Sequence, residues 1–534
     1  MVGITSPVPR RALALVLLAL AVLAGVGLRA AATLPKESFT HDEAISYIAA
    51  TCHQGEYQDV TFGGSGPYGR WVPAYEWQRL LQPEDRGCLG RIAADLARYD
   101  IHPPLYFWLL HGWALLFGVG VWTGTSLNIV LAGLGALALF GLARRVLGDD
   151  VRAAAVALVW AVSPAVVEVF AEARQYELFG LLTILVTWQA LRFAGPDGGR
   201  RRDVALLAVV TAAGLLTHYH FVIVLAGVAG LLLVQLGRTA RPRLLGGLGA
   251  MAAGCVAFGL LHPRFWMAFA TQRRQAGGFV AEQFPGRLDQ VAETLSAFLL
   301  PPGAATTALR WPVAALVVAT AVWLGIATAR AALRGREAVG APVMLMLAWT
   351  GGVTVGLYLL FVSHGLAMTP KYLAAAWPFM AFVPVLAAAR LPARTRLPVG
   401  ATGCVLLAVV GALAAARINT DGEPPAPGAV VTRADSVVVD NVARGIFPRV
   451  VWELPPNARV FAAEQRRLLA DPGRWTGPVR GRTILVTDLP VSDARYGNSP
   501  ARGAAVLAEL RRGHAVVPTG EGGVRGLGRV YTVR

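Results

Sequence analysis

Four short polar stretches interrupt an otherwise apolar chain, and each carries side chains that can hold or transfer charge. They are His41-Asp42-Glu43, IHPPLY at 101–106, EARQY at 172–176 and Lys371-Tyr372. An acid in such a set can take a proton from a hydroxyl group. Arginine binds a phosphate through two parallel hydrogen bonds, and lysine binds it as a point charge. These residue types suit a site that activates a hydroxyl group beside a phosphate.

Each stretch also has an ordinary structural explanation, and the sequence leaves both explanations open. The two acids of the first stretch suit the N-terminus of a short helix, where the helix dipole favours negative charge. In the second stretch, proline stands where the first turn of a helix accepts it. The Glu–Arg pair of the third could be an ion pair at the membrane rim. The lysine of the fourth could extend its amine towards the lipid head groups.

The composition is that of a membrane protein. Charged residues form only 15% of the 534 residues, apolar residues form 55%, and the mean hydropathy is +0.52. A soluble domain usually carries about 25% charged residues, so this composition excludes a purely soluble protein, and its apolar content excludes a disordered one. Ionisable side chains at membrane depth are costly and usually functional. The polar stretches therefore predict an anion site at one membrane surface.

We expect an all-α polytopic membrane protein with about twelve transmembrane helices, each near the roughly 20 residues that cross a bilayer. The apolar segments lie at 8–32, 104–120, 122–143, 152–170, 177–194, 203–218, 220–237, 244–262, 311–330, 341–362, 372–390 and 397–416. Two polar loops, 33–103 and 263–310, interrupt the series, and short helices are expected near 42–50 and 89–99. An odd number of crossings must separate an outer first loop from inner Arg144 and Arg145. Only two segments lie between them, so one of the two, such as 104–120, is expected to be re-entrant or split.

The net charge of +17 reflects arginines in the short breaks between apolar segments. They cluster at 144–145, 200–202, 238–243, 330–336 and 390–396. This pattern is typical of cytoplasmic loops, and the chain has no recognisable nucleic-acid-binding module, so we expect no nucleic-acid partner. Arg10 and Arg11 place the N-terminus inside, and we interpret the first apolar run as an uncleaved helix rather than a signal peptide.

The apolar density falls after Arg417, which divides the chain into a transmembrane catalytic region, 1–417, and a C-terminal region, 418–534. The second region has β-like runs at 437–439, 483–487 and 514–517 and a helical pattern at 501–512. These patterns predict a small soluble α/β domain outside the cytoplasm. Its excess of arginine over acid suggests contact with an anionic surface, and a solvated lid without a binding role is the alternative.

The four cysteines fall into two pairs. Cys52 and Cys88 share the first polar loop, where a disulfide is expected if the loop is extracytoplasmic. Two free thiols are the alternative. Cys255 and Cys404 lie within apolar segments and are expected to be small buried hydrophobic residues.

Five segments together resemble a known superfamily of membrane enzymes. FTHDEAISY, HPPLYFWLLHGW, EARQYELFGLL, THYHF and KYLAAAWPF occur in the order and spacing of the GT-C superfamily, across roughly residues 10–390. Within it, the chain is similar to bacterial membrane glycosyltransferases related to protein O-mannosyltransferases and to the aminoarabinose transferase of lipid A. Each segment alone is a weak signal, whereas five in order are specific.

The resemblance implies an inverting glycosyltransferase of the bacterial inner membrane with its active site on the extracytoplasmic side. Such enzymes move a sugar from a polyprenyl-phosphate donor to a glycan, lipid or protein acceptor. Asp42 matches their catalytic base, with Glu43 as its neighbour or substitute. Residues implied to bind the donor phosphate or substrate are His102, Tyr106, Glu172, Arg174, Tyr176, His218, Tyr219, His220, Lys371 and Tyr372. Lys371 departs from the family's arginine, because it keeps the charge and loses the two-pronged geometry.

Other positions and activities stay open at this point. Arg273 or Arg274 is a further candidate for the phosphate, and His218 could instead end a helix. The acids and histidines near Asp42 match no closed zinc spacing, so we expect metal-independent transfer and leave a divalent cation open. The chain lacks a P-loop, which argues against an ATP-driven exporter. A lipid-linked glycan flippase or transporter, or a glycan ligase, is the alternative function.

Overall fold

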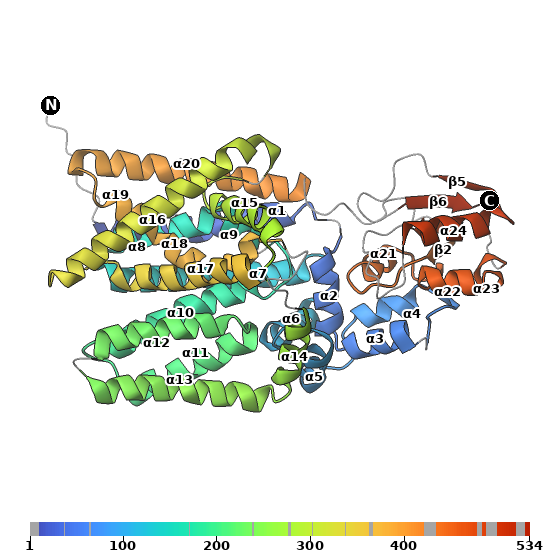
Figure 1. Cartoon of the computed structure of the whole chain (residues 1–534), viewed down its shortest axis with the longest axis horizontal. Helices are drawn as coiled ribbons and strands as arrows, with labels where there is room; N and C mark the ends of the chain where they lie inside the picture. Colours follow the sequence, from blue (N-terminus) through green and yellow to red (C-terminus); the bar gives the residue numbers. More distant parts are fainter. Residues whose placement is uncertain are drawn as a thin grey trace.

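The computed structural model describes residues 10–36, 38–63, 66–169, 171–237, 240–275, 279–301, 303–336, 338–361, 367–420, 434–477, 483–487, 499–518 and 529–533. A bundle of long helices forms one end of the molecule, and a sheet with short helices forms the other (Figure 1). Between them lie helices of the first polar loop, next to α14 (Phe265–Gln275) of the second.

The chain is a multi-pass membrane protein. Seven of its described helices are long and apolar enough to cross a bilayer. They are α1 (Arg10–Thr33), α7 (Thr123–Leu147), α10 (Tyr176–Ala194), α13 (Arg241–Leu261), α16 (Arg310–Leu333), α17 (Ala341–Phe361) and α20 (Ala393–Thr420). The expected total of about twelve stays a prediction, since the other apolar segments form helices shorter than the roughly 20 residues a straight crossing needs.

The shorter helices complete the bundle. They are α6 (Leu105–Phe117), α8 (Asp150–Val162), α9 (Pro164–Val169), α11 (Arg201–Thr217), α12 (Phe221–Leu236), α18 (Trp377–Met380) and α19 (Phe382–Ala388). The segment expected at 372–390 is therefore divided, and it begins with the 3₁₀ turn η4 (Pro370–Leu373). α6 has only 13 residues. It lies in the 104–120 segment, which was expected from the sequence to be re-entrant or split.

Small residues let the helices around α7 approach closely, as is common between membrane helices. A Cβ atom at Gly135 would lie 2.7 Å from the Trp160 ring of α8, and one at Gly141 would lie 2.6 Å from Trp188 of α10. The bundle exposes many apolar side chains on its outer surface. Cys255 is among the exposed residues and Cys404 is half-buried, so the expectation of two buried thiols was wrong. In a bilayer, an apolar segment presents residues to lipid as well as to its neighbours.

The first polar loop folds into a compact layer. It contains α2 (His41–Ala50), α3 (Gln54–Gly63), β1 (Trp71–Pro73), α4 (Tyr75–Gln78), η1 (Arg79–Leu81) and α5 (Leu89–Tyr99). The helices expected near 42–50 and 89–99 are thus confirmed. Cys52 and Cys88 form a disulfide, as expected, which joins the end of α2 to the start of α5.

The second polar loop and the C-terminal region contribute the remaining elements. The loop forms α14, η2 (Ala281–Gln283), α15 (Phe284–Ser296) and η3 (Ala304–Leu309). The C-terminal region forms β2 (Ser436–Val439), α21 (Phe447–Trp452), β3 (Arg459–Ala462), α22 (Gln465–Ala470), α23 (Gly473–Thr476), β4 (Thr483–Thr487), α24 (Pro500–Arg511), β5 (Val516–Pro518) and β6 (Arg529–Val533).

One six-stranded sheet, in the order β1-β3-β2-β4-β6-β5, combines strands from both ends of the chain. β2 runs parallel to β3 and β4, with Val437 opposite Val460 and Ile484. These three strands are continuous apolar runs, which is typical of parallel strands covered on both faces. β1 of the first loop adds antiparallel to β3, with Trp71 opposite Phe461. The sheet therefore includes a strand that lies outside the 418–534 region.

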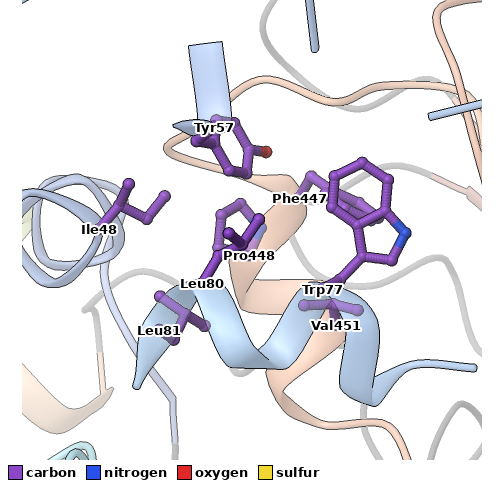
Figure 2. Close-up of a pocket in the computed structure, with 8 residues that line it drawn as sticks. All are labelled: Ile48, Tyr57, Trp77, Leu80, Leu81, Phe447, Pro448 and Val451. Carbon is purple, nitrogen blue, oxygen red and sulfur yellow. The ribbon is translucent and has the colours of Figure 1, made fainter. Parts of the chain in front are cut away.

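An apolar contact fixes the first loop against α21. Trp77 and Leu80 of the loop line one small apolar pocket together with Phe447 and Pro448 of α21 (Figure 2). The rings of Trp77 and Phe447 meet edge to face at 4.7 Å. Gln78 Nε2 donates hydrogen bonds to two backbone carbonyl groups around the end of α21, at 2.9 and 2.8 Å. The C-terminal region thus packs directly on the loop that carries Asp42.

Candidate active site

Four charged side chains from three distant segments meet at the junction between the bundle and the first loop. We call Asp42, Glu172, Arg174 and Lys371 the ionic cluster. Lys371 Nζ lies 2.9 Å from Asp42 Oδ2 and 3.1 Å from Glu172 Oε2. Arg174 Nη2 lies 3.2 Å from Asp42 Oδ1. Asp42 is therefore held between two cations, and its side chain remains 23% exposed.

Glu43 lies next to Asp42 in sequence but takes part in different contacts. Thr40 and Glu43 form a capping box at the start of α2, with Thr40 N donating to Glu43 Oε2 at 2.8 Å. Ala173 N donates to Glu43 Oε1 at 3.0 Å, and Lys36 forms an ion pair with the same carboxylate. Glu43 is completely buried. It therefore fixes the segment around Arg174 against α2 and does not face Lys371.

Tyr106 is connected to the ionic cluster through Asn128 rather than by a direct hydrogen bond. Its hydroxyl donates to Asn128 Oδ1 at 3.1 Å, and Asn128 Nδ2 donates to the carbonyl of Glu172 at 2.7 Å. Tyr106 and Asn128 are both fully buried. This chain of contacts connects α6 and α7 to the segment that carries Glu172 and Arg174, so the conformation of that segment depends on the packed bundle.

Burial and the charges of the ionic cluster together shift the pKa values of its acids. Burial alone would raise the pKa of Asp42, but Arg174 and Lys371 outweigh it and hold that pKa well below its usual range. Burial raises the pKa of Glu172 despite the opposing charge of Lys371. The two acids raise the pKa of Lys371 above its usual value, against the effect of burial. Asp42 is thus an ionised carboxylate, and both cations stay charged.

Three histidines form a second group, which we call the histidine cluster: His102, His218 and His220. The His102 and His218 ring centroids are 6.4 Å apart, and those of His218 and His220 are 4.9 Å apart. Phe179 stacks on His218 at 4.9 Å. Burial lowers the pKa of His218 and of His220, and the neighbouring histidines add to the effect. Both imidazoles are therefore neutral at pH 7.

Tyr176 lies between the two clusters. Its ring centroid is 5.7 Å from that of His218 and 5.9 Å from Lys371 Nζ, and the Tyr372 ring is 6.3 Å away. Tyr219 has different neighbours, because its hydroxyl meets His262 Nε2 at 3.0 Å and its ring packs on Phe269. Of the residues predicted for the site, all but Glu43, Tyr106 and Tyr219 therefore belong to these two clusters or to the aromatic contacts between them. The side chains of Arg273 and Arg274 are outside the described part of the chain.

Several contacts of the site were not predicted from the sequence. Lys36, Ser46 and Asn128 hold Glu43, Arg174 and Glu172, respectively, with Arg174 Nη1 to Ser46 Oγ at 3.5 Å. Asp100 binds His102 and had a local signal, since an acid two residues before a histidine can orient its ring. Arg444 reaches Asp100 from the C-terminal region, and no sequence pattern pointed to it.

The described residues include one group whose metal-ligating atoms lie close together: Cys52, Cys88 and His111. The two cysteines are joined as a disulfide, so their sulfur atoms are not thiolates that could bind a metal. The acids and histidines around Asp42 do not form such a group. The chemistry of the site is therefore argued from its charges and hydrogen bonds.

A protein family matches part of the sequence, and solved structures match the fold over most of the chain. A family described as dolichyl-phosphate-mannose-protein mannosyltransferase matches residues 101–262. ArnT from Cupriavidus metallidurans bound to undecaprenyl phosphate aligns with a TM-score of 0.54 and 13% identity over 97% of each chain. The chain has the GT-C fold. Apo ArnT gives the same TM-score, at 14% identity and the same coverage.

The alignment with ArnT extends over 97% of both chains, so it includes residues of the α/β sheet as well as of the bundle. AglB, the oligosaccharyltransferase of Archaeoglobus fulgidus in complex with an inhibitory peptide and a dolichol-phosphate, matches at a TM-score of 0.44 and 13% identity, over 76% of this chain and 56% of its own. No curated protein sequence matches the chain. The alignment with ArnT confirms, at the level of fold alone, the GT-C resemblance expected from the five segments.

Proposed function

We propose that this protein is an inverting glycosyltransferase that moves a sugar from a polyprenyl-phosphate donor to a hydroxyl group of a cell-envelope acceptor. One observation carries the proposal: the Asp42 carboxylate is held between Arg174 and Lys371 at a partly exposed position. A base and two phosphate-binding cations then lie within one hydrogen-bond length of each other. Transfer from a lipid phosphate needs both kinds of group in one site, because a base activates the attacking hydroxyl group and cations stabilise the phosphate that leaves.

The donor phosphate would bind to Arg174 and Lys371. Arginine suits phosphate oxygens because its nitrogen atoms form a planar fork, and the lysine adds a mobile charge. The apolar bundle offers the environment that the polyprenyl chain requires. ArnT, which shares the fold, has been crystallised with undecaprenyl phosphate, and this supports a lipid phosphate as the ligand here.

Donor binding would also prepare Asp42 as a base. In the structure, two cations hold its pKa far below the range in which a carboxylate accepts a proton readily. A bound phosphate adds negative charge beside Asp42 and takes up hydrogen bonds of Arg174 and Lys371. Both effects raise the pKa of Asp42. The carboxylate thus becomes more basic when the donor is in place.

The reaction then proceeds in one displacement. The acceptor hydroxyl gives its proton to an Asp42 carboxylate oxygen as its own oxygen forms a bond to the anomeric carbon. The bond between that carbon and the phosphate oxygen breaks, and its electron pair remains on the phosphate. Arg174 and Lys371 stabilise this charge. Attack from the face opposite the phosphate inverts the anomeric configuration.

The membrane placement forms part of the same proposal. Residues 1–417 form the transmembrane catalytic region with about twelve crossings, and 418–534 form most of an α/β domain. The arginine-rich breaks lie in the cytoplasm of a bacterial cell, so the ionic cluster faces the extracytoplasmic side. The disulfide between Cys52 and Cys88 supports this orientation, because disulfides persist in oxidising compartments.

The test uses purified protein, undecaprenyl-phosphate sugars of several kinds and an envelope extract as acceptor. Released undecaprenyl phosphate is measured by mass spectrometry, since it is the product common to every donor. Asp42→Asn should lower release about 100- to 10,000-fold. Asp85→Asn, which changes an exposed acid of the same loop, is the matched control. Undiminished release from a correctly folded Asp42→Asn protein would refute the assigned base.

Two further measurements separate the proposal from the alternatives. Nuclear magnetic resonance of the product reports the anomeric configuration, and retention would contradict the single displacement. Product mass distinguishes one added sugar from the whole glycan that a ligase transfers. Movement of donor lipid across reconstituted vesicles, without a covalent product from any donor, would favour a flippase.

A further inference from the structure

The segment that follows β2 connects the α/β sheet to the candidate active site. Asp440 stands at the carboxyl end of β2, and the chain continues through 441–446 to α21. Tyr57 Oη of α3 donates to the Val442 carbonyl at 2.8 Å. A Cβ atom at Gly445 would lie 2.2 Å from the His41 ring of α2. This segment therefore lies directly against the helix turn that carries Asp42.

Arg444 extends from this segment to Asp100. Its Nη2 atom lies 3.3 Å from Asp100 Oδ2, and Asp100 Oδ1 lies 2.5 Å from His102 Nδ1. Gln54 Nε2 donates a longer hydrogen bond, 3.4 Å, to Asp100 Oδ2. Asp100 is 5% exposed, so its charge depends on these partners rather than on water. Contacts from Arg444 to Asp100 and from Asp100 to His102 thus connect the segment after β2 to the histidine cluster.

The contacts of Asp100 fix the orientation of His102. Burial would raise the pKa of Asp100, but Arg444 and then His102 outweigh it, and that pKa lies well below its usual range. An ionised carboxylate only accepts hydrogen bonds, so His102 Nδ1 must carry the proton that it donates. His102 Nε2, on the opposite edge of the ring, is then the nitrogen atom available to a substrate.

The geometry points to Arg444 as a positioning residue that acts through Asp100 on His102. The inference rests on the proposed glycosyl transfer and on the role in substrate binding that the GT-C resemblance implies for His102. The apolar contact of Trp77 and Leu80 with Phe447 and Pro448 keeps α21 in place (Figure 2). Arg444 lies three residues before the start of α21. The α/β region is thus a part of the active site, since it holds one side of the His102 ring in position.

The test compares turnover of Arg444→Met with that of Arg444→Lys and the wild type. Loss of the charge should lower kcat roughly tenfold, which is a modest cost for a misplaced substrate contact. Arg444→Lys keeps the positive charge and should retain most of the wild-type kcat. Affinity for undecaprenyl phosphate should not change, because the phosphate binds the ionic cluster. Arg459→Met is the matched control, since Arg459 is an arginine of the C-terminal region that lies over the Trp71 ring and, among the described residues, contacts neither cluster.

A double-mutant cycle distinguishes positioning from a merely structural role. In a His102→Gln background, Arg444→Met should have no further effect on kcat, because its target is gone. An equal tenfold loss in both backgrounds, or a loss that lysine does not reduce, would overturn the inference. So would an unchanged kcat in Arg444→Met. If His102→Gln turns over too slowly to measure, the lysine rescue and the unchanged phosphate affinity decide.

The proposed function and this inference fail in different ways. If the wild type releases no undecaprenyl phosphate from any donor, the glycosyl transfer itself is refuted. If the wild type is active and Arg444→Met matches it, only the positioning role is refuted. Thermal unfolding of each variant in detergent shows whether it retains the stability of the wild type, so that a loss of turnover is not a loss of folding.

Discussion

The ionic cluster and the histidine cluster lie on either side of Tyr176, and different forces hold them. In the ionic cluster, two acids and two cations from three segments neutralise one another over distances of 2.9 to 3.2 Å. In the histidine cluster, the neutral His218 ring stacks on Phe179, the neutral His220 ring lies beside it, and Asp100 orients His102. The difference suggests a division of tasks. Exchangeable charges suit a phosphate, whereas neutral rings suit the hydroxyl-bearing faces of a sugar or acceptor.

The largest effect is expected at Lys371, the residue shared by both acids. Lys371→Ala leaves the Asp42 and Glu172 carboxylates without the cation between them and removes a phosphate contact. We expect release of undecaprenyl phosphate to fall about 1,000-fold, comparable to the loss of one strong electrostatic contact in an active site. Lys371→Arg should retain more activity. Arg330→Ala, an exposed cation at the end of α16, should have no effect. Equal activity of Lys371→Ala and wild type would remove the ionic cluster from the mechanism.

Glu43→Gln should affect stability more than chemistry. The change breaks a buried ion pair with Lys36 while preserving shape. Removing one partner of a buried pair costs about 3 kcal/mol. The midpoint of thermal unfolding in detergent should therefore fall, and the exposed Glu84→Gln should not change it. A stable Glu43→Gln protein that has lost turnover would instead make Glu43 a participant in the reaction.

A smaller effect is expected in the histidine cluster. His218→Phe keeps the stacking on Phe179 but loses the Nδ1 atom that accepts a hydrogen bond from His220 N at 3.1 Å. One such bond contributes about 0.5 to 1.5 kcal/mol to the stability of the local structure that holds His220. This value limits the cost of misplacing His220, so turnover should fall by no more than roughly tenfold. Affinity for undecaprenyl phosphate should not change. A large loss of that affinity would show that the two clusters do not divide their tasks as described.

The pH dependence of stability should show no effect of Asp42 near neutrality. Its pKa is lowered in the folded protein, so its ion pairs contribute fully at every pH above the unfolded pKa, about 3.9, and are lost as the pH falls towards the lowered value. The difference in unfolding temperature between wild type and Asp42→Asn should therefore be the same at pH 5.5 and pH 8. A difference that shrinks within this window would mean that the cations do not hold Asp42 ionised.

Much of the site was predictable because the chain is so apolar. In such a sequence, each polar stretch at a helix end stands out, and His102, Glu172, Arg174 and Lys371 were identified in this way. The helices α2 and α5 were also predictable, from local patterns. Residues that support the site from within the bundle, such as Asn128, were not, because one polar residue in an apolar helix gives no direction.

The sequence by itself determined that this is a multi-pass membrane protein and which short stretches carry its charge. Only the tertiary structure decided that Asp42 faces Arg174 and Lys371 while Glu43 supports the loop. Successive residues of a helix point about 100° apart, so neighbouring acids meet different surroundings. It also brought Lys371 to Asp42 across 329 residues and placed Arg444 beside Asp100. Such contacts depend on how whole elements pack, and no local pattern of residues encodes them.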